Sequence, residues 1–343
     1  MSARQTIIPV FVPHVGCPND CVFCNQRRIS GAVRPVTPEE VSCAIQQGAA
    51  ITPHGVQRQL AFYGGSFTAI PAMAQERLLG AAQPYLADGT ITSIRLSTRP
   101  DAIDEETLLR LRRYGVKTIE LGAQSMDDRV LQLSGRGHTA QQVIDAARMV
   151  KQHGFELILQ MMTGLPGDED GAASIMSARA LAQLHPDGVR IYPTVIVRDT
   201  ALYDLWKAGN YQEHTVEAAV SVCAEIVPIF ETAGVPIIRL GLNPTEDLTE
   251  GDAAGGAYHP ALGELVRSRI MLDRARALFI EVEPGSSVIL QVGKGKLSQM
   301  IGQHRCNLSS LITEFALESI KIQEKDEKSD EISLLFVAKS EKI

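Results

Sequence analysis

Aromatic side chains are scarce in this 343-residue chain, where tryptophan, tyrosine and phenylalanine together make up 5% of the residues. So small a share disfavours an all-β fold and suits an alanine- and leucine-rich α/β chain. No apolar run approaches the roughly 18 residues that a membrane-spanning helix needs. The first sixteen residues also lack the small-residue cleavage site of a secretory leader. These absences predict a cytoplasmic protein with no membrane partner.

An excess of positive charge is also missing. The chain has 33 Lys and Arg against 40 Asp and Glu, a net charge of −7. This balance argues against nonspecific binding of nucleic acid through bulk charge, although it leaves room for a local basic groove. The length suggests about two domains, or one large domain with an appendage.

The cysteines do not form a disulfide framework. Cys17, Cys21 and Cys24 stand close together with C-x3-C-x2-C spacing, and the other three are scattered along the chain. In a reducing compartment such a cluster indicates metal binding or catalysis. One interpretation is a structural zinc with His14 as the fourth ligand. The other is a four-iron cluster on three thiolates, which leaves one iron open for a substrate or cofactor.

Short apolar runs alternate with amphipathic helical stretches along most of the chain. Runs of continuous apolar character separated by helices indicate a parallel sheet or a barrel. Thr37 and Glu40 predict a capping box at the start of one such helix. We therefore expect a partial (β/α)6-type barrel in residues 1–280, with strands within 6–12, 58–65, 91–100, 116–125, 155–167, 188–197 and 235–242.

The pattern changes near residue 280. Segments 277–284 and 286–293 alternate like antiparallel strands, and a helical stretch and two more strand-like segments follow. Residues 281–343 are expected to form a small α+β domain. Because functional groups of parallel α/β folds gather at the carboxyl ends of the strands, the glycine-rich and polar segments after each barrel strand predict one shared site.

The cysteine spacing directly after the first strand resembles the radical S-adenosylmethionine (SAM) superfamily, whose barrel is related to the TIM barrel. The resemblance implies a [4Fe–4S] cluster on Cys17, Cys21 and Cys24, with SAM bound to the fourth iron. It also implies reductive cleavage of SAM to a 5′-deoxyadenosyl radical. Phe23 matches an aromatic residue that packs on the adenine in that superfamily, and loop packing is the alternative role.

Further motifs match the SAM-binding positions of this superfamily. "GGS" stands where the superfamily has GGE, so the SAM amino group would meet backbone carbonyls and a serine hydroxyl. In "STRPD", the side chains of Ser97 and Arg99 are expected to face inward and contact SAM. "LGAQS", "SGRGHT" and the strand "QMMTGLPG" resemble segments of the branch containing anaerobic coproporphyrinogen oxidase. In the strand, which contacts the ribose in that enzyme, Gln160 replaces an aspartate. The implied SAM contacts, besides Phe23, are Gly64, Gly65, Ser66, Ser97, Arg99, Gln124, Arg136 and Gln160.

Residues 5–270 more narrowly resemble the family of the catalytic third subunit of Elongator. "STRPD", "ELGAQS", "GRGHT", "MMTGLPG" and "RIYPTVIVRDTALYDLWKAGNY" carry the likeness. The cysteine loop is shorter here, and the family's acetyltransferase domain has no counterpart. The resemblance implies modification of the tRNA wobble uridine and an electron donor such as flavodoxin or ferredoxin. Two alternatives remain open, namely radical chemistry on a small metabolite and a noncatalytic RNA-binding protein with structural zinc.

Aromatic residues after the sixth barrel strand are candidates for substrate contact. Tyr192 stands at the strand end and is our candidate for a substrate-facing residue. Tyr203 and Trp206 follow on a predicted helix, where a buried aromatic face is the simpler interpretation.

The C-terminal segment "MIGQHRCNLSSLITEF" resembles the core of a KH-type RNA-binding module, in which a GxxG loop joins two helices. Gly302 matches the first glycine, and Arg305 takes the place of the second. We expect arginine to be unable to copy the backbone role of that glycine. Lys294 and Lys296 are candidate phosphate contacts. A dimerisation or lid role is the alternative.

Overall fold

The structure is a computed structural model that describes residues 5–12, 17, 20–24, 34–53, 55–242, 253–327, 329 and 331–339. His14, the candidate zinc ligand, lies outside the described residues. The chain divides into two compact units, Met1–Thr215 with Pro228–Tyr258 and Val216–Val227 with His259–Ile343. The boundary expected at residue 280 stays a prediction, and residues 259–280 group with the second unit in this division.

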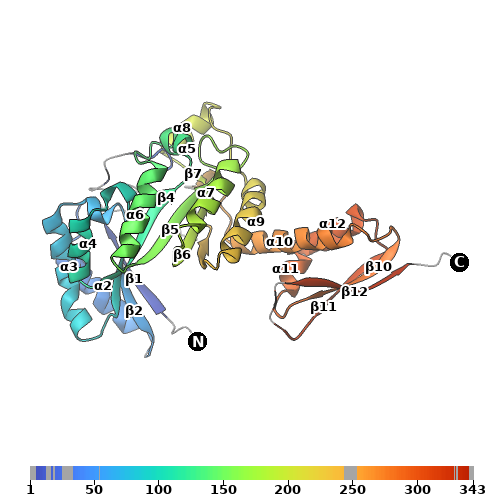
Figure 1. Cartoon of the computed structure of the whole chain (residues 1–343), viewed down its shortest axis with the longest axis horizontal. Coiled ribbons are helices and arrows are strands. Elements are labelled where there is room, and N and C mark those ends of the chain that lie inside the picture. Colours follow the sequence, from blue (N-terminus) through green and yellow to red (C-terminus); the bar gives the residue numbers. More distant parts are fainter. Residues whose placement is uncertain are drawn as a thin grey trace. The chain divides into compact units, whose positions relative to one another are not determined.

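A curled sheet of parallel strands forms the first unit (Figure 1). The sheet has seven strands in the order β1-β2-β3-β4-β5-β6-β8, so neighbours in space are neighbours in the chain. The predicted partial barrel is confirmed. The strands are β1 (Gln5–Val12), β2 (Gln57–Gly64), β3 (Ser93–Thr98), β4 (Val116–Gln124), β5 (Glu156–Thr163), β6 (Gly188–Pro193) and β8 (Ile237–Leu240).

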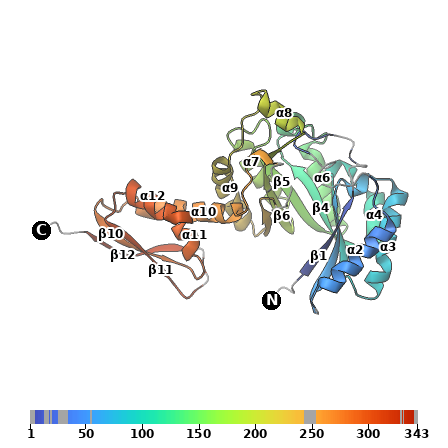
Figure 2. The same ribbon diagram turned by 180° about the vertical axis from the view of Figure 1, so that it is seen from behind.

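Helices cover one face of this sheet, and the two opposite views show them on the same side of the strands (Figures 1 and 2). They alternate with the strands, as the rhythm of the sequence predicts. The helices on this face are α2 (Pro38–Ile51), α3 (Ala72–Ala87), α4 (Glu105–Arg113), α6 (Ala140–Gln152) and α7 (Ala172–Ala182). Helices α5 (Asp128–Leu133) and α8 (Ala201–Lys207) lie near the ends of the strands (Figure 1), and the 3-10 turns η2 (Phe67–Ala69) and η3 (Pro100–Ala102) follow β2 and β3. Helix α9 (Val216–Thr232) is shared between the units, and β7 (Val195–Val197) pairs with β9 (Ala253–Gly256) in a separate antiparallel ribbon.

Local capping signals explain where several helices begin. Thr37 and Glu40 form the predicted capping box of α2, and the Thr37 side chain accepts from the Glu40 backbone N–H. Thr139 and Gln142 form the same arrangement on α6. Asp104 caps α4 by accepting from the Thr107 N–H at 2.7 Å. Each cap satisfies backbone donors that the first helical turn leaves unpaired.

The second unit packs three helices on one face of a mixed sheet. Strand β10 (Ser286–Val292) pairs in parallel with β11 (Ser319–Glu324) and antiparallel with β12 (Ile332–Lys339). The helices are α10 (Leu262–Phe279), α11 (Leu297–Ile301) and α12 (Cys306–Glu314), the last two joined by the 3-10 turn η5 (Gln303–Arg305). The predicted strand at 277–284 is wrong, because Phe279 continues the apolar spacing of α10 and is fully buried beside Phe315.

The turn between α11 and α12 corrects a second expectation. Arg305 adopts φ 62° and ψ 25°, which is the left-handed conformation that a glycine would supply. Gly302 also has a positive φ, of 76°. Of the two candidate phosphate contacts, Lys294 lies 3.4 Å from the Asp326 carboxylate, which partly offsets its charge.

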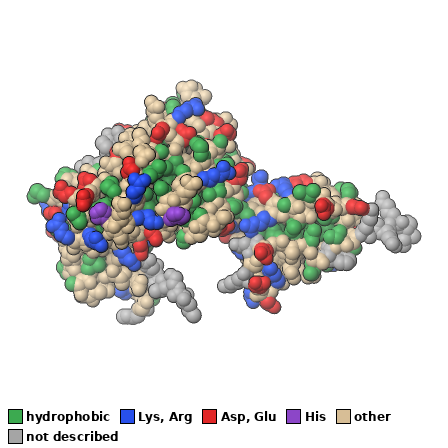
Figure 3. All heavy atoms as spheres, viewed as in Figure 1, with side chains coloured by type: hydrophobic (Ala, Val, Ile, Leu, Met, Phe, Trp, Pro, Cys, Tyr) green, Lys and Arg blue, Asp and Glu red, His purple; other side chains and the backbone are tan. Residues whose placement is uncertain are grey.

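The surface shows mixed charge. On the face drawn in Figure 3, basic and acidic side chains are interspersed over both units. Among the described residues, no helix has the length and apolar character to cross a membrane.

Candidate functional site: a cysteine-lined cavity at the mouth of the half-barrel

The turn that carries the second and third cysteines is held from both sides by backbone hydrogen bonds. The Val22 N–H donates to the Ser134 carbonyl at 3.0 Å, and the Val22 carbonyl accepts from the Leu202 N–H at 2.8 Å. Within the turn, the Cys24 N–H donates to the Cys21 carbonyl at 2.9 Å. The segment after β4 and the start of α8 therefore position the turn. None of these three cysteines forms a disulfide.

These thiols border a cavity of about 120 Å³. Every residue that the sequence predicted for the cluster and for SAM lies on its wall, although the predicted binding roles themselves stay predictions. The sequence did not single out Thr98 and Gly122, which also lie there. The lining residues are Cys17, Cys21, Phe23, Cys24, Gly64, Gly65, Ser66, Ser97, Thr98, Arg99, Gly122, Gln124, Arg136 and Gln160.

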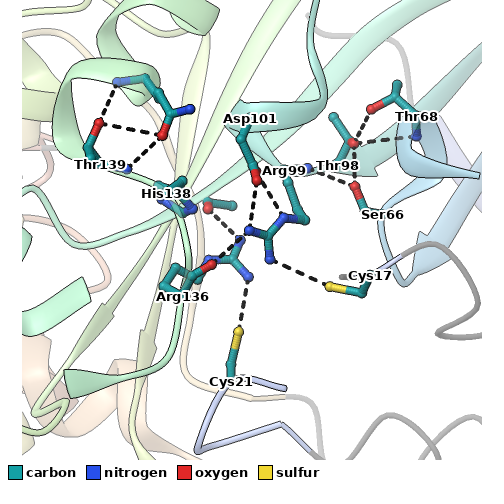
Figure 4. Close-up of polar contacts among 12 residues, drawn as sticks. Cys17, Cys21, Ser66, Thr68, Thr98, Arg99, Asp101, Arg136, His138 and Thr139 are labelled. Atoms are coloured by element: carbon teal, nitrogen blue, oxygen red, sulfur yellow. Dashed lines mark hydrogen bonds and ion pairs between the residues drawn. The ribbon is translucent and has the colours of Figure 1, made fainter. Parts of the chain in front are cut away.

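Arg99 connects the cysteine loop to the wall (Figure 4). Its guanidinium makes a two-point ion pair with Asp101, at 2.9 Å for each contact, and donates to the Arg136 carbonyl at 2.7 Å. A further N–H reaches Cys17 Sγ at 3.6 Å. Burial alone would lower the pKa of Arg99, but Asp101 and Cys17 outweigh it and raise that pKa. The side chain is thus a fixed positive charge beside a thiol.

Arg136 has the same relation to the second cysteine. It is 7% exposed, donates to the Gly122 carbonyl at 2.7 Å and approaches Cys21 Sγ at 3.6 Å (Figure 4). Two guanidinium groups therefore face two of the three sulfur atoms. Such N–H donors stabilise thiolates and other negatively charged sulfur ligands.

The Ser66 hydroxyl contributes to the framework of the wall. It lies 2.8 Å from the Thr98 hydroxyl, accepts from the Arg99 N–H at 3.2 Å and is 3% exposed. This bonding ties the loop after β2 to the end of β3. The neighbouring Gly64 has φ 105°, and a Cβ there would lie 2.5 Å from the Val12 carbonyl oxygen, so only glycine fits the close approach of β1 and β2.

An irregularity in β4 directs Gln124 toward the cavity. The register between β4 and β5 shifts between Gly122 and Gln124, and Gln124 has φ 64°. A bulge at a strand end commonly re-aims a side chain. A left-handed glutamine carries a conformational cost that a binding role would explain.

Gln160 lies between the cavity and the interior of the half-barrel. Its amide nitrogen donates to a Glu120 oxygen at 2.8 Å. Its amide oxygen then remains as the acceptor for a hydroxyl donor. This geometry suits the predicted ribose contact in place of an aspartate.

Glu120 is the functional feature that sequence reasoning missed. Its side chain is 1% exposed and accepts from Arg95 at 2.8 Å, from Arg190 Nη2 at 3.2 Å and from Tyr63 at 3.3 Å, besides Gln160. The available signal was a single charge in the middle of each apolar strand, acidic in β4 and basic in β3 and β6. The four donors fix the interior below the cavity.

Tyr192 projects from the same face of β6 as Arg190, two residues nearer the strand end. It is paired in register with Met162 and does not line the cavity. Burial raises the pKa of its phenol. Its substrate-facing role stays a prediction.

The aromatic residues of α8 pack against the protein interior, which is the simpler of the two interpretations of the sequence. Tyr203 and Trp206 lie 6.1 Å apart and pack, half-buried, on the apolar cluster of Ile196, Leu202 and Tyr211. Phe23 packs on the same cluster and also lines the cavity, so loop packing and cavity lining coexist at this position.

Two buried histidines near the site also escaped prediction as functional or structural groups. His138 Nε2 lies 3.2 Å from the Ala123 carbonyl, and burial followed by the charge of Arg136 lowers its pKa to about 4. His214 Nε2 lies 3.0 Å from the Thr163 hydroxyl, and burial lowers its pKa to about 4. Both are neutral at pH 7.

Comparison with known proteins identifies the family. The model described as "Radical SAM superfamily" matches residues 11–176, and that of the "Radical_SAM C-terminal domain" matches residues 186–271. The chain belongs to the radical SAM superfamily. It is a radical SAM enzyme whose relatives include Elongator third subunits.

Elongator complex protein 3 of Danio rerio is 31% identical over 179 residues, covering 52% of this chain and 32% of the relative. The tRNA uridine(34) acetyltransferase of Methanocaldococcus jannaschii is 29% identical over 138 residues, covering 40% of this chain and 26% of the relative. This radical SAM enzyme thus spans between a quarter and a third of the length of these two curated relatives. Elp3 of the archaeon Methanocaldococcus infernus shares its fold, with a TM-score of 0.60 at 22% identity, over 79% of this chain and 63% of that one.

The residues present fit the cofactors that the superfamily implies. Three thiols border one cavity, and two fixed guanidinium groups lie beside two of them, a donor set suited to an anionic iron–sulfur cluster. Within the described chain, no three His, Cys, Asp or Glu side chains are arranged to hold a single metal ion. The wall also includes glycine carbonyls, amides and the two arginines, which are hydrogen-bonding groups of the kind that the polar groups of SAM would need.

Gly122 offers a way to test this wall. A Cβ there would lie 2.7 Å from Arg136 Nη2 and 2.8 Å from Gln124 Nε2, so Gly122→Ala must displace both side chains. We expect SAM affinity of the reconstituted enzyme to fall at least about tenfold, as for loss of one charge-assisted hydrogen bond. Equilibrium dialysis with labelled SAM measures it.

Gly80→Ala is the matched control. A Cβ at Gly80, within helix α3, meets no atom within 4 Å. This variant should bind SAM like the wild type and be equally stable or slightly more stable. Wild-type SAM affinity in Gly122→Ala would contradict the assignment of the wall.

Proposed function

We propose that this enzyme cleaves SAM reductively to a 5′-deoxyadenosyl radical and uses the radical to modify tRNA at a wobble uridine. The observation that carries the first half is the convergence of Cys17, Cys21 and Cys24 on one cavity whose wall also holds the predicted SAM contacts. A [4Fe–4S] cluster on these thiolates would supply the electron for the cleavage.

The chain's own residues supply binding and orientation. Arg99 and Arg136 offset negative charge at the sulfur ligands and hold the loop at a fixed position. The carbonyls around Gly64 and Gly65 are suited to an ammonium group, and the Gln160 oxygen to a ribose hydroxyl. Because these partners are fixed by their own hydrogen bonds, the wall is preorganised.

The tRNA half of the proposal is supported by the relatives. One relative is a tRNA uridine(34) acetyltransferase, and several others are Elongator complex protein 3. In the second unit, Arg305 adopts the left-handed conformation in the turn between two helices that resembles a KH-type loop. An electron donor such as flavodoxin or ferredoxin belongs to the same proposal.

The cluster is tested by replacing its ligands. Cys17→Ala, Cys21→Ala and Cys24→Ala should each lose the brown colour, the reduced-cluster electron paramagnetic resonance signal and formation of 5′-deoxyadenosine after anaerobic reconstitution. Cys43→Ala removes an exposed thiol on α2 and should keep all three. A colourless wild-type protein that binds one zinc would overturn the proposal.

The substrate is tested separately by mass spectrometry of tRNA nucleosides from a deletion strain. A missing wobble-uridine modification, restored by the wild-type gene and not by Cys24→Ala, is the expected result. An unchanged nucleoside profile, with 5′-deoxyadenosine formation intact, would instead indicate that the radical acts on a small metabolite.

A further inference from the structure

Two arginines, Arg190 and Arg239, lie on the strands next to those that line the cavity, at the same level of the half-barrel. In register, Gly122 of β4 pairs with Gln160 of β5, Gln160 with Arg190 of β6, and Arg190 with Arg239 of β8. Paired residues of parallel strands project from the same face of a sheet. Gly122 and Gln160 border the cavity. Arg190 and Arg239 therefore lie at the same height on β6 and β8, next to the cavity.

The only buried carboxylate among the described residues of this interior wall is already fully engaged. Glu120 accepts from Arg95, Arg190, Tyr63 and Gln160, which occupies both of its oxygens. The next carboxylate, on Glu156, is 41% exposed and interacts with Lys117 at 3.0 Å and with Thr118. Neither carboxylate is a partner of Arg239.

The charges of this wall do not balance. Arg95, Arg190 and Arg239 contribute +3 and Glu120 contributes −1, which leaves +2, while Lys117 and Glu156 offset each other. Among the described residues, no hydrogen bond or ion pair involves the Arg239 side chain. Its register partner is Arg190, and Tyr192, on the same face of β6, is close enough for the charge of Arg239 to act on its phenol. Half-buried positive charge without an anion is unfavourable.

We infer that the β6–β8 side of the half-barrel binds an anionic group of the substrate, a carboxylate or a phosphate, through Arg239 with Tyr192 beside it. A guanidinium donates two parallel hydrogen bonds to either anion, and the phenol adds a third donor. Arg190, held by Glu120, contributes its charge. The inference rests on the proposed function in one respect, since it assumes that the substrate enters beside the SAM cavity.

The first test measures anion binding alone. The reconstituted protein with SAM is titrated calorimetrically with malonate, inorganic phosphate, uridine 5′-monophosphate and uridine in a buffer free of other carboxylates and phosphates. At least one anion should bind, and uridine should bind more weakly than its monophosphate. Malonate preference identifies a carboxylate substrate, and phosphate or nucleotide preference identifies a phosphate.

Variants show whether the binding is at this wall. Arg239→Gln should weaken binding of that anion by roughly 10- to 100-fold, and Tyr192→Phe by roughly two- to tenfold. Arg179→Gln makes the same charge change at an exposed position on α7 and should bind like the wild type. Added NaCl should weaken wild-type binding and affect Arg239→Gln less.

Absence of anion binding in the wild type, or equal binding in Arg239→Gln and Arg179→Gln, would overturn the inference. Its failure is distinguishable from that of the proposed function. A protein that binds the anion through Arg239 but forms no 5′-deoxyadenosine retains the site and loses the radical chemistry. A protein that forms 5′-deoxyadenosine but binds no anion would support the proposed SAM cleavage and contradict the anion site.

Discussion

Replacing Glu120 by glutamine is expected to lower the free energy of unfolding by about 3–5 kcal/mol, the usual cost of removing one partner of a buried ion pair. The substitution keeps the shape of the side chain and removes its charge. Arg95 and Arg190, whose side chains are 9% and 10% exposed, would then be buried without a counter-ion.

Urea unfolding of the metal-free protein, followed by circular dichroism, measures this effect. Glu156→Gln provides the control, because it makes the same chemical change on the neighbouring strand β5, where the carboxylate is 41% exposed. We expect the control to lose no more than about 1 kcal/mol. Equal losses in the two variants would show that the Glu120 network does not stabilise the fold.

Mild acid is expected to have the second large effect. His138 and His214 are 5% and 6% exposed, and burial lowers each pKa from 6.5 to about 4. The unfolded chain therefore binds protons at these residues before the folded chain does. Their stabilising contribution is complete above pH 6.5, declines as pH falls from 6.5 to about 4, and does not decline further below that.

The size of this effect follows from the same values. By pH 5, each histidine should cost about 2 kcal/mol of stability relative to pH 7. His138→Gln and His214→Gln should each remove about half of the combined loss, and the double variant nearly all of it. His185→Gln, at an exposed position, should retain the wild-type loss. Urea unfolding at pH 7, 6 and 5 gives the comparison, and parallel profiles for the wild type and the double variant would refute this account.

Much of the fold was predictable because its signals are local. The capping box of Thr37 and Glu40 and the apolar runs of the strands can be read within a few residues. The wall of the cavity was predictable for a related reason, since parallel strands bring their following loops together. The error at 277–284 has a local cause too, because a short apolar run suits a helix as well as a strand.

The interior network was not predictable in the same way. Arg95, Glu120 and Arg190 lie on three different strands, and their contacts depend on register and curvature. The orientation of Gln124 depends on a register shift that no residue nearby in sequence signals. The backbone of Arg305 was mispredicted because a residue type gives only a preference for a conformation, which the packing of two helices can override.

The backbone contacts of Val22 bear on the order in which the protein can mature. Its two partners, Ser134 and Leu202, are 112 and 180 residues further along the chain. The cysteines leave the ribosome before either partner, because proteins are synthesised from the N-terminus. The turn between Cys21 and Cys24 cannot make both of these contacts until Leu202 has been synthesised. Delivery of iron and sulfide is therefore expected to follow folding of the half-barrel.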